Sequence, residues 1–197
     1  MKSKSDQVRP VGLNELGQIT LRGNVAFAVR CAERMRPCFN VPDNVERKRE
    51  KTAAVEVAIR IAHAFCRGMP VEPGRAAAAV RPAIEAAEET GEDTCWAAYA
   101  AVRAVEAVAH AERVTNNQSD DDVTEVIAVA FGAGRVVAAN VDAFSLNQVV
   151  EALRADVDKL LRLAGGSAER LGPEIDPSEN GPLGALWPAG IPLCYQR

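Results

Sequence analysis

The sequence is poor in aromatic residues, since two Trp, two Tyr and five Phe make up only 5% of its 197 residues. Strands of β-sandwiches favour aromatic and β-branched side chains, so this scarcity argues against an all-β fold. An excess of charge of one sign is also lacking, because 23 Lys and Arg stand against 27 Asp and Glu and leave a net charge of −4. We therefore do not expect a strongly basic nucleic-acid-binding protein.

Long hydrophobic runs are absent as well. The longest uncharged apolar run, residues 126–134, ends after nine residues between Glu125 and Arg135. A membrane-spanning helix needs about 18 or more such residues, so no membrane segment is predicted. Lys2 and Lys4 are not followed by an apolar stretch, which argues against a secretory signal peptide. We expect a cytoplasmic protein.

The five cysteines contain no CxxC pair, and their number is odd. Reduced, buried thiols are the usual state of such residues in the cytoplasm. His63 and Cys66 are three residues apart on one predicted helix, and His110 is the only other histidine. A zinc site needs three or four converging ligands, so we favour no metal and no cofactor. A metal or acid–base site around His63, Cys66 and His110 remains the enzymatic alternative.

Alanine is abundant, with 35 residues, and hydrophobic residues make up 48% of the chain. Apolar residues recur at steps of three and four, which predicts amphipathic helices. Six are expected, at about residues 21–39, 43–68, 73–90, 93–114, 119–141 and 145–164. Pro82 predicts a kink or a break into two short helices in the third. The fourth is small and apolar nearly all round, which is typical of a central helix.

The end of the chain differs in composition. Residues 171–197 hold five of the 11 prolines and four of the 14 glycines, so regular helix is not expected there. Leu183, Leu186, Trp187 and Tyr195 nevertheless make this segment too apolar for a disordered linker. We predict an all-α fold: a disordered tail (1–11), a single helical bundle (12–170), and an extended C-terminal arm (171–197) that packs on the bundle.

Basic residues concentrate in the first third of the chain. Residues 1–60 hold 12 Lys and Arg against seven Asp and Glu, a balance of +5, and the rest carries −9. The predicted basic edge flanks the first helix connection and consists of Arg30, Arg34, Arg36, Arg47, Lys48 and Arg49. Its charge suits an acidic protein partner. With no aromatic residues interleaved for base stacking, nucleic acid is a poorer fit.

Two local patterns allow a chemical interpretation. Gly132 and Gly134 follow an apolar run, as in a dinucleotide-binding loop, but the third position of that fingerprint is Val137. We favour close helix packing at these glycines. Glu106 lies four residues before His110, a spacing that permits an acid–base pair but more often supports a surface helix.

Three segments carry a family resemblance: the run from Arg30 to Pro37 (RCAERMRP), the helix end Phe65-Cys66-Arg67-Gly68, and the Ala-rich stretch from Trp96 to Ala111. Together, over about residues 20–115, they resemble all-helical immunity proteins of bacterial polymorphic toxin systems. The resemblance implies a cytoplasmic protein that neutralises a toxin by binding it, and brings no catalytic residues. After residue 115 the histidine-bearing, Ala-rich repeats expected of such proteins are missing.

The closing run from Asp176 to Pro188 (DPSENGPLGALWP) looks like the C-terminal signature of uncharacterised bacterial proteins and implies no activity. The favoured function is therefore non-catalytic: a protein-binding or regulatory protein, with an immunity-type inhibitor as its most specific form. The two alternatives are the enzyme described above and a structural protein that forms homo-oligomers through its Ala and Gly helix faces.

Overall fold

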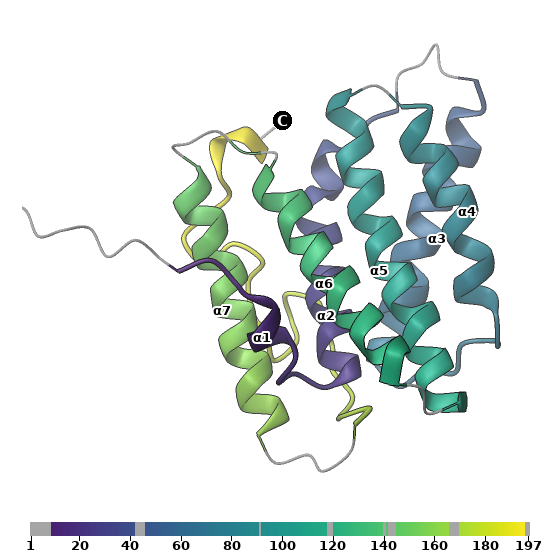
Figure 1. The fold of residues 1–197 in the computed structure, drawn as a ribbon. Coiled ribbons are helices and arrows are strands. Elements are labelled where there is room, and N and C mark those ends of the chain that lie inside the picture. Colours follow the sequence, from purple (N-terminus) through teal and green to yellow (C-terminus); the bar gives the residue numbers. More distant parts are fainter. Residues whose placement is uncertain are drawn as a thin grey trace, which may run out of the picture.

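The computed structural model describes residues 9–41, 46–90, 92–117, 120–139, 141, 145–165 and 170–195. Within these ranges the chain is all helical and contains no strand, so the predicted all-α class is confirmed (Figure 1). The α-helices are α1 (Leu13–Leu16), α2 (Leu21–Met35), α3 (Lys48–Cys66), α4 (Arg75–Glu88), α5 (Glu92–Asn117), α6 (Asp120–Ala139) and α7 (Leu146–Ala164). The six predicted helices correspond to α2–α7, and the four-residue α1 was not predicted.

Helix α5 is the centre of the bundle, in contact with α2, α3, α4 and α6. Its alanines are buried: Ala97, Ala98, Ala100, Ala101, Ala104, Ala107, Ala109 and Ala111. Because alanine side chains are small, the backbones of neighbouring helices can approach α5 closely, and four helices can pack around it. The prediction of a central helix is confirmed.

Helix α4 runs through Pro82 as one helix, so of the two predicted outcomes, a kink or a break into two short helices, the break does not occur. Proline removes the hydrogen bond that the carbonyl four residues earlier would have accepted. That carbonyl belongs to Ala78, and both Ala78 and Pro82 are exposed. Water can therefore serve the freed carbonyl, and the helix continues.

Helix α2 is buried over nearly its whole circumference, not along one stripe. Thr20 caps its start by accepting a hydrogen bond from the Gly23 N–H. Its end tightens into a short 3-10 helix, η1 (Arg36–Cys38), in which Pro37 occupies an early position. A helix enclosed in this way places even its long polar side chains inside the protein.

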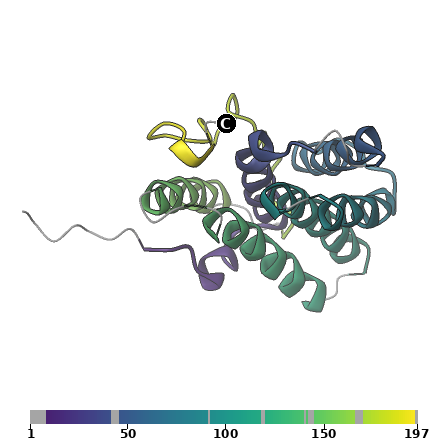
Figure 2. The same ribbon diagram turned by 90° about the horizontal axis from the view of Figure 1, so that it is seen from above.

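Helix α7 stands at one side of the bundle, beside α6 and α2 (Figure 1). Seen from above, the C-terminal segment covers one side of α7, while α1 and the residues before it lie on the other (Figure 2). Residues 1–8 of the predicted tail lie outside the described residues. Residues 9–11 do not hang free, because Arg154 of α7 donates hydrogen bonds to the carbonyls of Arg9 and Pro10.

The C-terminal segment, residues 170–195, is irregular apart from the short 3-10 helix η2 (Leu193–Tyr195). It begins against α2, where the carbonyls of Arg170 and Leu171 accept hydrogen bonds from the first N–H groups of that helix. Ile175, Leu183 and Tyr195 are buried, whereas Ile191 and Leu193 are exposed. Trp187 stacks on Tyr195 with ring centroids 5.2 Å apart. Apolar anchors thus alternate with exposed turns along the segment.

No described helix combines the length and the apolar character that a membrane crossing requires. The hydrophobic residues instead form a single buried cluster drawn from α1–α7 and from the C-terminal segment.

Candidate functional site: an arginine-lined groove on α2 and α3

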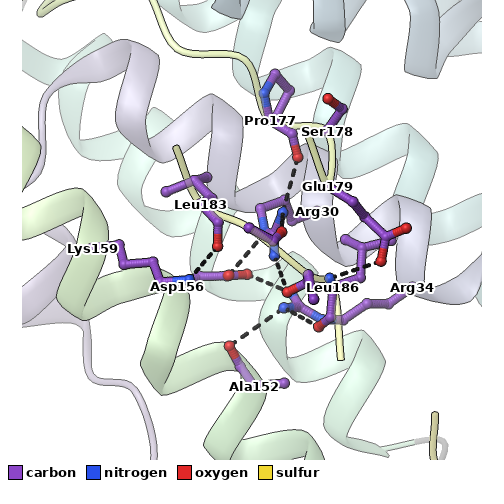
Figure 3. A network of polar contacts seen from close by, with 12 residues as sticks. Arg30, Arg34, Ala152, Asp156, Lys159, Pro177, Ser178, Glu179, Leu183 and Leu186 are labelled. Carbon is purple, nitrogen blue, oxygen red and sulfur yellow. Dashed lines mark hydrogen bonds and ion pairs between the residues drawn. The ribbon is translucent and has the colours of Figure 1, made fainter. Parts of the chain in front are cut away.

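Two of the six residues in the predicted basic edge are not on the surface. The side chains of Arg30 and Arg34 are 0% exposed. Their assignment as surface partner-binding residues is therefore a misreading, which the structure corrects. They lie one turn apart on a helix that is buried over nearly its whole circumference, and both point toward α7 and the C-terminal segment (Figure 3).

The two buried guanidinium groups bind backbone carbonyls of the C-terminal segment. Arg30 donates to the carbonyls of Pro177 (3.1 Å), Gly184 (2.9 Å) and Ala185 (2.8 Å). Arg34 donates twice to the carbonyl of Leu186, at 2.8 and 3.0 Å. An irregular segment has no helix or sheet to satisfy its carbonyls, so donors must come from side chains when it is buried.

Asp156 of α7 supplies the negative charge that these cations need. Its Oδ1 lies 2.8 Å from Nε of Arg30, and its Oδ2 lies 2.7 Å from Nη1 of Arg34. Asp156 is itself buried. Arg34 also lies over the ring of Trp187, 5.3 Å from its centroid. The two arginines therefore attach the C-terminal segment to α2 and α7 and are structural.

The remaining four residues of the basic edge lie at the surface. The side chain of Arg36 is 56% exposed, Arg47 and Arg49 are exposed, and Lys48 is half-buried. Arg47 has positive φ (59°) just before α3 and pairs with Glu50 at 3.4 Å. Residues 42–45, which include the predicted start of the second helix, lie outside the described part of the chain.

A polar groove of about 330 Å³ opens beside Arg36, between α2 and α3. Its lining residues come from the end of α2 and from one face of α3 and the residue after it: Glu33, Arg36, Glu56, Ile59, Arg60, His63 and Arg67. Three guanidinium groups thus face two carboxylates. Arg67 is partly held by Asp176 of the C-terminal segment, with Nη2 and Oδ1 2.8 Å apart.

His63 is fixed at the wall of this groove by Glu33. The Nε2 atom of His63 and Oε1 of Glu33 are 2.9 Å apart, and both side chains are mostly buried. The hydrogen bond to His63 holds the pKa of the Glu33 carboxyl below its ordinary value, and the nearby Arg36 acts in the same direction. Glu33 is therefore ionised at neutral pH, and its negative charge offsets part of the positive charge of the groove.

The three metal and acid–base candidates lie on two different helices. His63 lies on α3 in the groove, His110 lies on α5, and the described residues contain no group of three or more His, Cys, Asp or Glu placed to hold a metal ion. Cys66 is fully buried, and burial raises the pKa of its thiol. Burial also raises the pKa of Cys31 to about 12. Neither thiol is an available nucleophile at neutral pH.

The acid–base pair that the spacing of Glu106 and His110 permits is not formed. Glu106 binds Arg103 at 2.8 Å, while Nδ1 of His110 accepts a hydrogen bond from Arg113 and lies 3.4 Å from Asp122 of α6. These contacts join two helix ends at the surface and form no enclosed site.

The dinucleotide-loop interpretation of Gly132 and Gly134 is also excluded, since both glycines lie inside α6 and the described residues before this helix contain no strand. A Cβ at Gly134 would lie 3.2 Å from the ring of Phe27. The favoured interpretation, close packing against a neighbouring helix, is confirmed.

Arg60, Arg67, Glu33 and Glu56 were not singled out from the sequence. A signal was present, because positions 56, 60, 63 and 67 share one helix face at steps of four and three and carry Glu, Arg, His and Arg. What the sequence did not show is that this face borders the end of α2 and encloses a groove.

No family model, no curated protein and no solved structure matches the chain.

Proposed function

We propose that the protein is a non-catalytic cytoplasmic binding protein that captures an acidic segment of a protein partner in the groove between α2 and α3. The observation that carries the proposal is the set of three guanidinium groups, Arg36, Arg60 and Arg67, which outnumber the two carboxylates that line the same open groove. Arginine forms paired hydrogen bonds to carboxylates, so a row of such groups suits Asp or Glu side chains.

The shape and the charge of the groove favour a peptide chain over a small substrate. The groove is open and polar, and the exposed Arg49 extends its positive charge along α3. Capture of a partner by electrostatic complementarity needs neither a nucleophile nor a metal. The resemblance to immunity proteins suggests that the partner is a toxin, which binding would neutralise.

The proposal can be tested with a labelled short poly-glutamate peptide, whose fluorescence anisotropy reports binding. We expect saturable binding that weakens between about 50 and about 300 mM salt, because exposed charges are screened. The double variant Arg36→Glu/Arg60→Glu should weaken binding about tenfold or more by placing like charges together.

Arg81→Glu is the matched control. Arg81 lies on α4 and its side chain is 88% exposed, so this variant reverses one charge away from the groove, against two in the double variant, and should leave binding nearly unchanged. Equal loss of peptide affinity in both variants would show that only the net charge of the protein matters, and not the groove. Tighter binding of a short DNA duplex than of the peptide would replace the acidic protein partner by a nucleic acid.

A further inference from the structure

A second cavity, unrelated to the arginine-lined groove, lies between α6 and α7. It measures about 190 Å³. Its lining comes from α2, α6, α7 and the residues before α1: Pro10, Val11, Phe27, Phe131, Gly134, Arg135, Ala138, Val150 and Leu153. All but one of these side chains are apolar. Small-molecule sites are commonly apolar hollows with a few polar groups that fix orientation.

Hydrogen bonds and an ion pair made by one residue of α7 hold the outer wall of this cavity in place. Arg154 of α7 donates to the carbonyls of Arg9 (3.3 Å) and Pro10 (3.1 Å), and its guanidinium pairs with Glu15 at 2.5 and 3.0 Å. Pro10 and Val11, which line the cavity, are thereby fixed beside it. One side of the cavity is thus formed by a segment with its own polar contacts to α7.

The inner wall is kept open by a glycine. Phe27 is fully buried, and a Cβ at Gly134 would lie 3.2 Å from two atoms of its ring. With no side chain at that position, the phenyl ring can form the floor of the cavity. An apolar cavity of about 150 Å³ is large enough to hold a benzene molecule. The cavity beside Gly134 therefore has room for one aromatic ring or a short aliphatic chain.

Arg135 is the one charged residue among the described residues that line the cavity, and it is exposed. A guanidinium at the mouth of an apolar cavity matches a molecule with an apolar body and a terminal carboxylate, which it can bind through two parallel hydrogen bonds. We propose that this cavity binds a small carboxylic acid whose aromatic or short aliphatic body enters between α6 and α7.

Phenylacetate and its uncharged amide, phenylacetamide, are the probes for a titration of the ¹⁵N-labelled full-length protein followed by NMR. We expect saturable shifts of the residues that line the cavity with phenylacetate, and about tenfold weaker binding of the amide because it lacks the charge-assisted hydrogen bonds. Absence of saturable shifts at these residues, or equal affinity for both probes, would overturn the proposal.

Two variants separate the apolar and the charged part of the site. Ala138→Leu extends into the cavity from α6 and should abolish binding, while Arg135→Gln should reduce the affinity for phenylacetate to that for the amide. Arg162→Gln, at an exposed position of α7 that does not line the cavity, is the control and should bind as the unmodified protein does.

Should Ala138→Leu fail to fold, Arg135→Gln decides, because its exposed side chain can be replaced without loss of packing. Unchanged affinity in that variant would contradict the role of Arg135 and with it the proposed ligand class. Shifts that follow protein concentration instead of phenylacetate would identify a second copy of the chain as the occupant and would also overturn the proposal.

Discussion

The two sides of α2 are held by different kinds of contact. On one side lies α5, whose buried positions are mostly Ala and Val. On the other lie α7 and the C-terminal segment, joined to α2 through Arg30, Arg34 and Asp156 (Figure 3). One side is apolar and closely spaced, and the other is ionic and rich in hydrogen bonds.

The difference follows from how each neighbour satisfies its own backbone. A helix such as α5 pairs its N–H and C=O groups internally, so it needs only a surface that fits. The irregular C-terminal segment presents unpaired carbonyls when it is buried. Arg30 and Arg34 donate hydrogen bonds to four of these carbonyls. Lys159 donates to the carbonyl of Leu183, and Gln148 donates to the carbonyls of Ala189 and Gly190. The burial of Arg30 and Arg34 is therefore explained by the irregular C-terminal segment beside them, whose backbone carbonyls need hydrogen-bond donors.

The strongest test of the ionic side is Asp156→Ala. Removing this carboxylate leaves two buried guanidinium groups without a counter-charge, which typically costs about 3–5 kcal/mol. For a chain of this size the melting temperature should fall by roughly 6–20 °C, measured by circular dichroism. Trp187 fluorescence should change as well, because the segment that carries it is released.

Asp158→Ala is the matched control, since Asp158 lies two residues away on α7 and is only weakly paired with Arg154 at 3.9 Å. Its effect should stay within about 0.5 kcal/mol. If both variants lost the same stability, the buried ion pairs would not hold the C-terminal segment, and the contrast between the two sides of α2 would fail.

A smaller effect is expected on the apolar side from Ala104→Leu. Ala104 is fully buried on α5, so the added atoms must displace a neighbouring helix, at a cost of about 1–3 kcal/mol. Urea unfolding measures the loss. Ala77→Leu, at an exposed position of α4, makes the same chemical change and should cost less than about 0.5 kcal/mol. Equal costs would mean that α5 is not closely packed.

The sequence predicted the helices well but not the two arginines that bind the C-terminal segment, for one physical reason. Hydrophobic periodicity is local, and it located α2–α7 and the central position of α5. The environment of Arg30 and Arg34 depends on residues 177–186, about 150 positions away. Hydrophobic periodicity carries no information about a contact between such distant positions. The available signal was Asp156, a charge within the apolar face that Leu153, Val157 and Leu160 define.

The same reasoning applies to Ser145 and Gln148, whose spacing predicts a capping box. The Ser145 side chain makes no capping hydrogen bond to α7, and Gln148 donates instead to Ala189 and Gly190. Here a tertiary contact replaces the local one. In the candidate site the charges were identified in part, but the groove arises from the packing of α2 on α3, which the sequence does not specify.

The smallest effect is expected where α7 binds the residues before α1, through an ion pair that is partly exposed. Hydrogen bonds from Arg154 and from the Gly12 N–H lower the pKa of Glu15 from 4.5 to about 2. Above about pH 4.5 Glu15 is ionised in both the folded and the unfolded protein, so the stabilisation is complete. Below that pH the unfolded chain takes up the proton first, and the stabilisation is lost as the pH falls toward 2.

Glu15→Gln should therefore cost about 1 kcal/mol of stability at pH 7, because solvent screens the pair, and progressively less at pH 4 and pH 3. Urea unfolding of both proteins at each pH measures this cost. A cost that is the same at pH 7 and pH 3 would show that Glu15 stabilises the protein by packing and not by its charge.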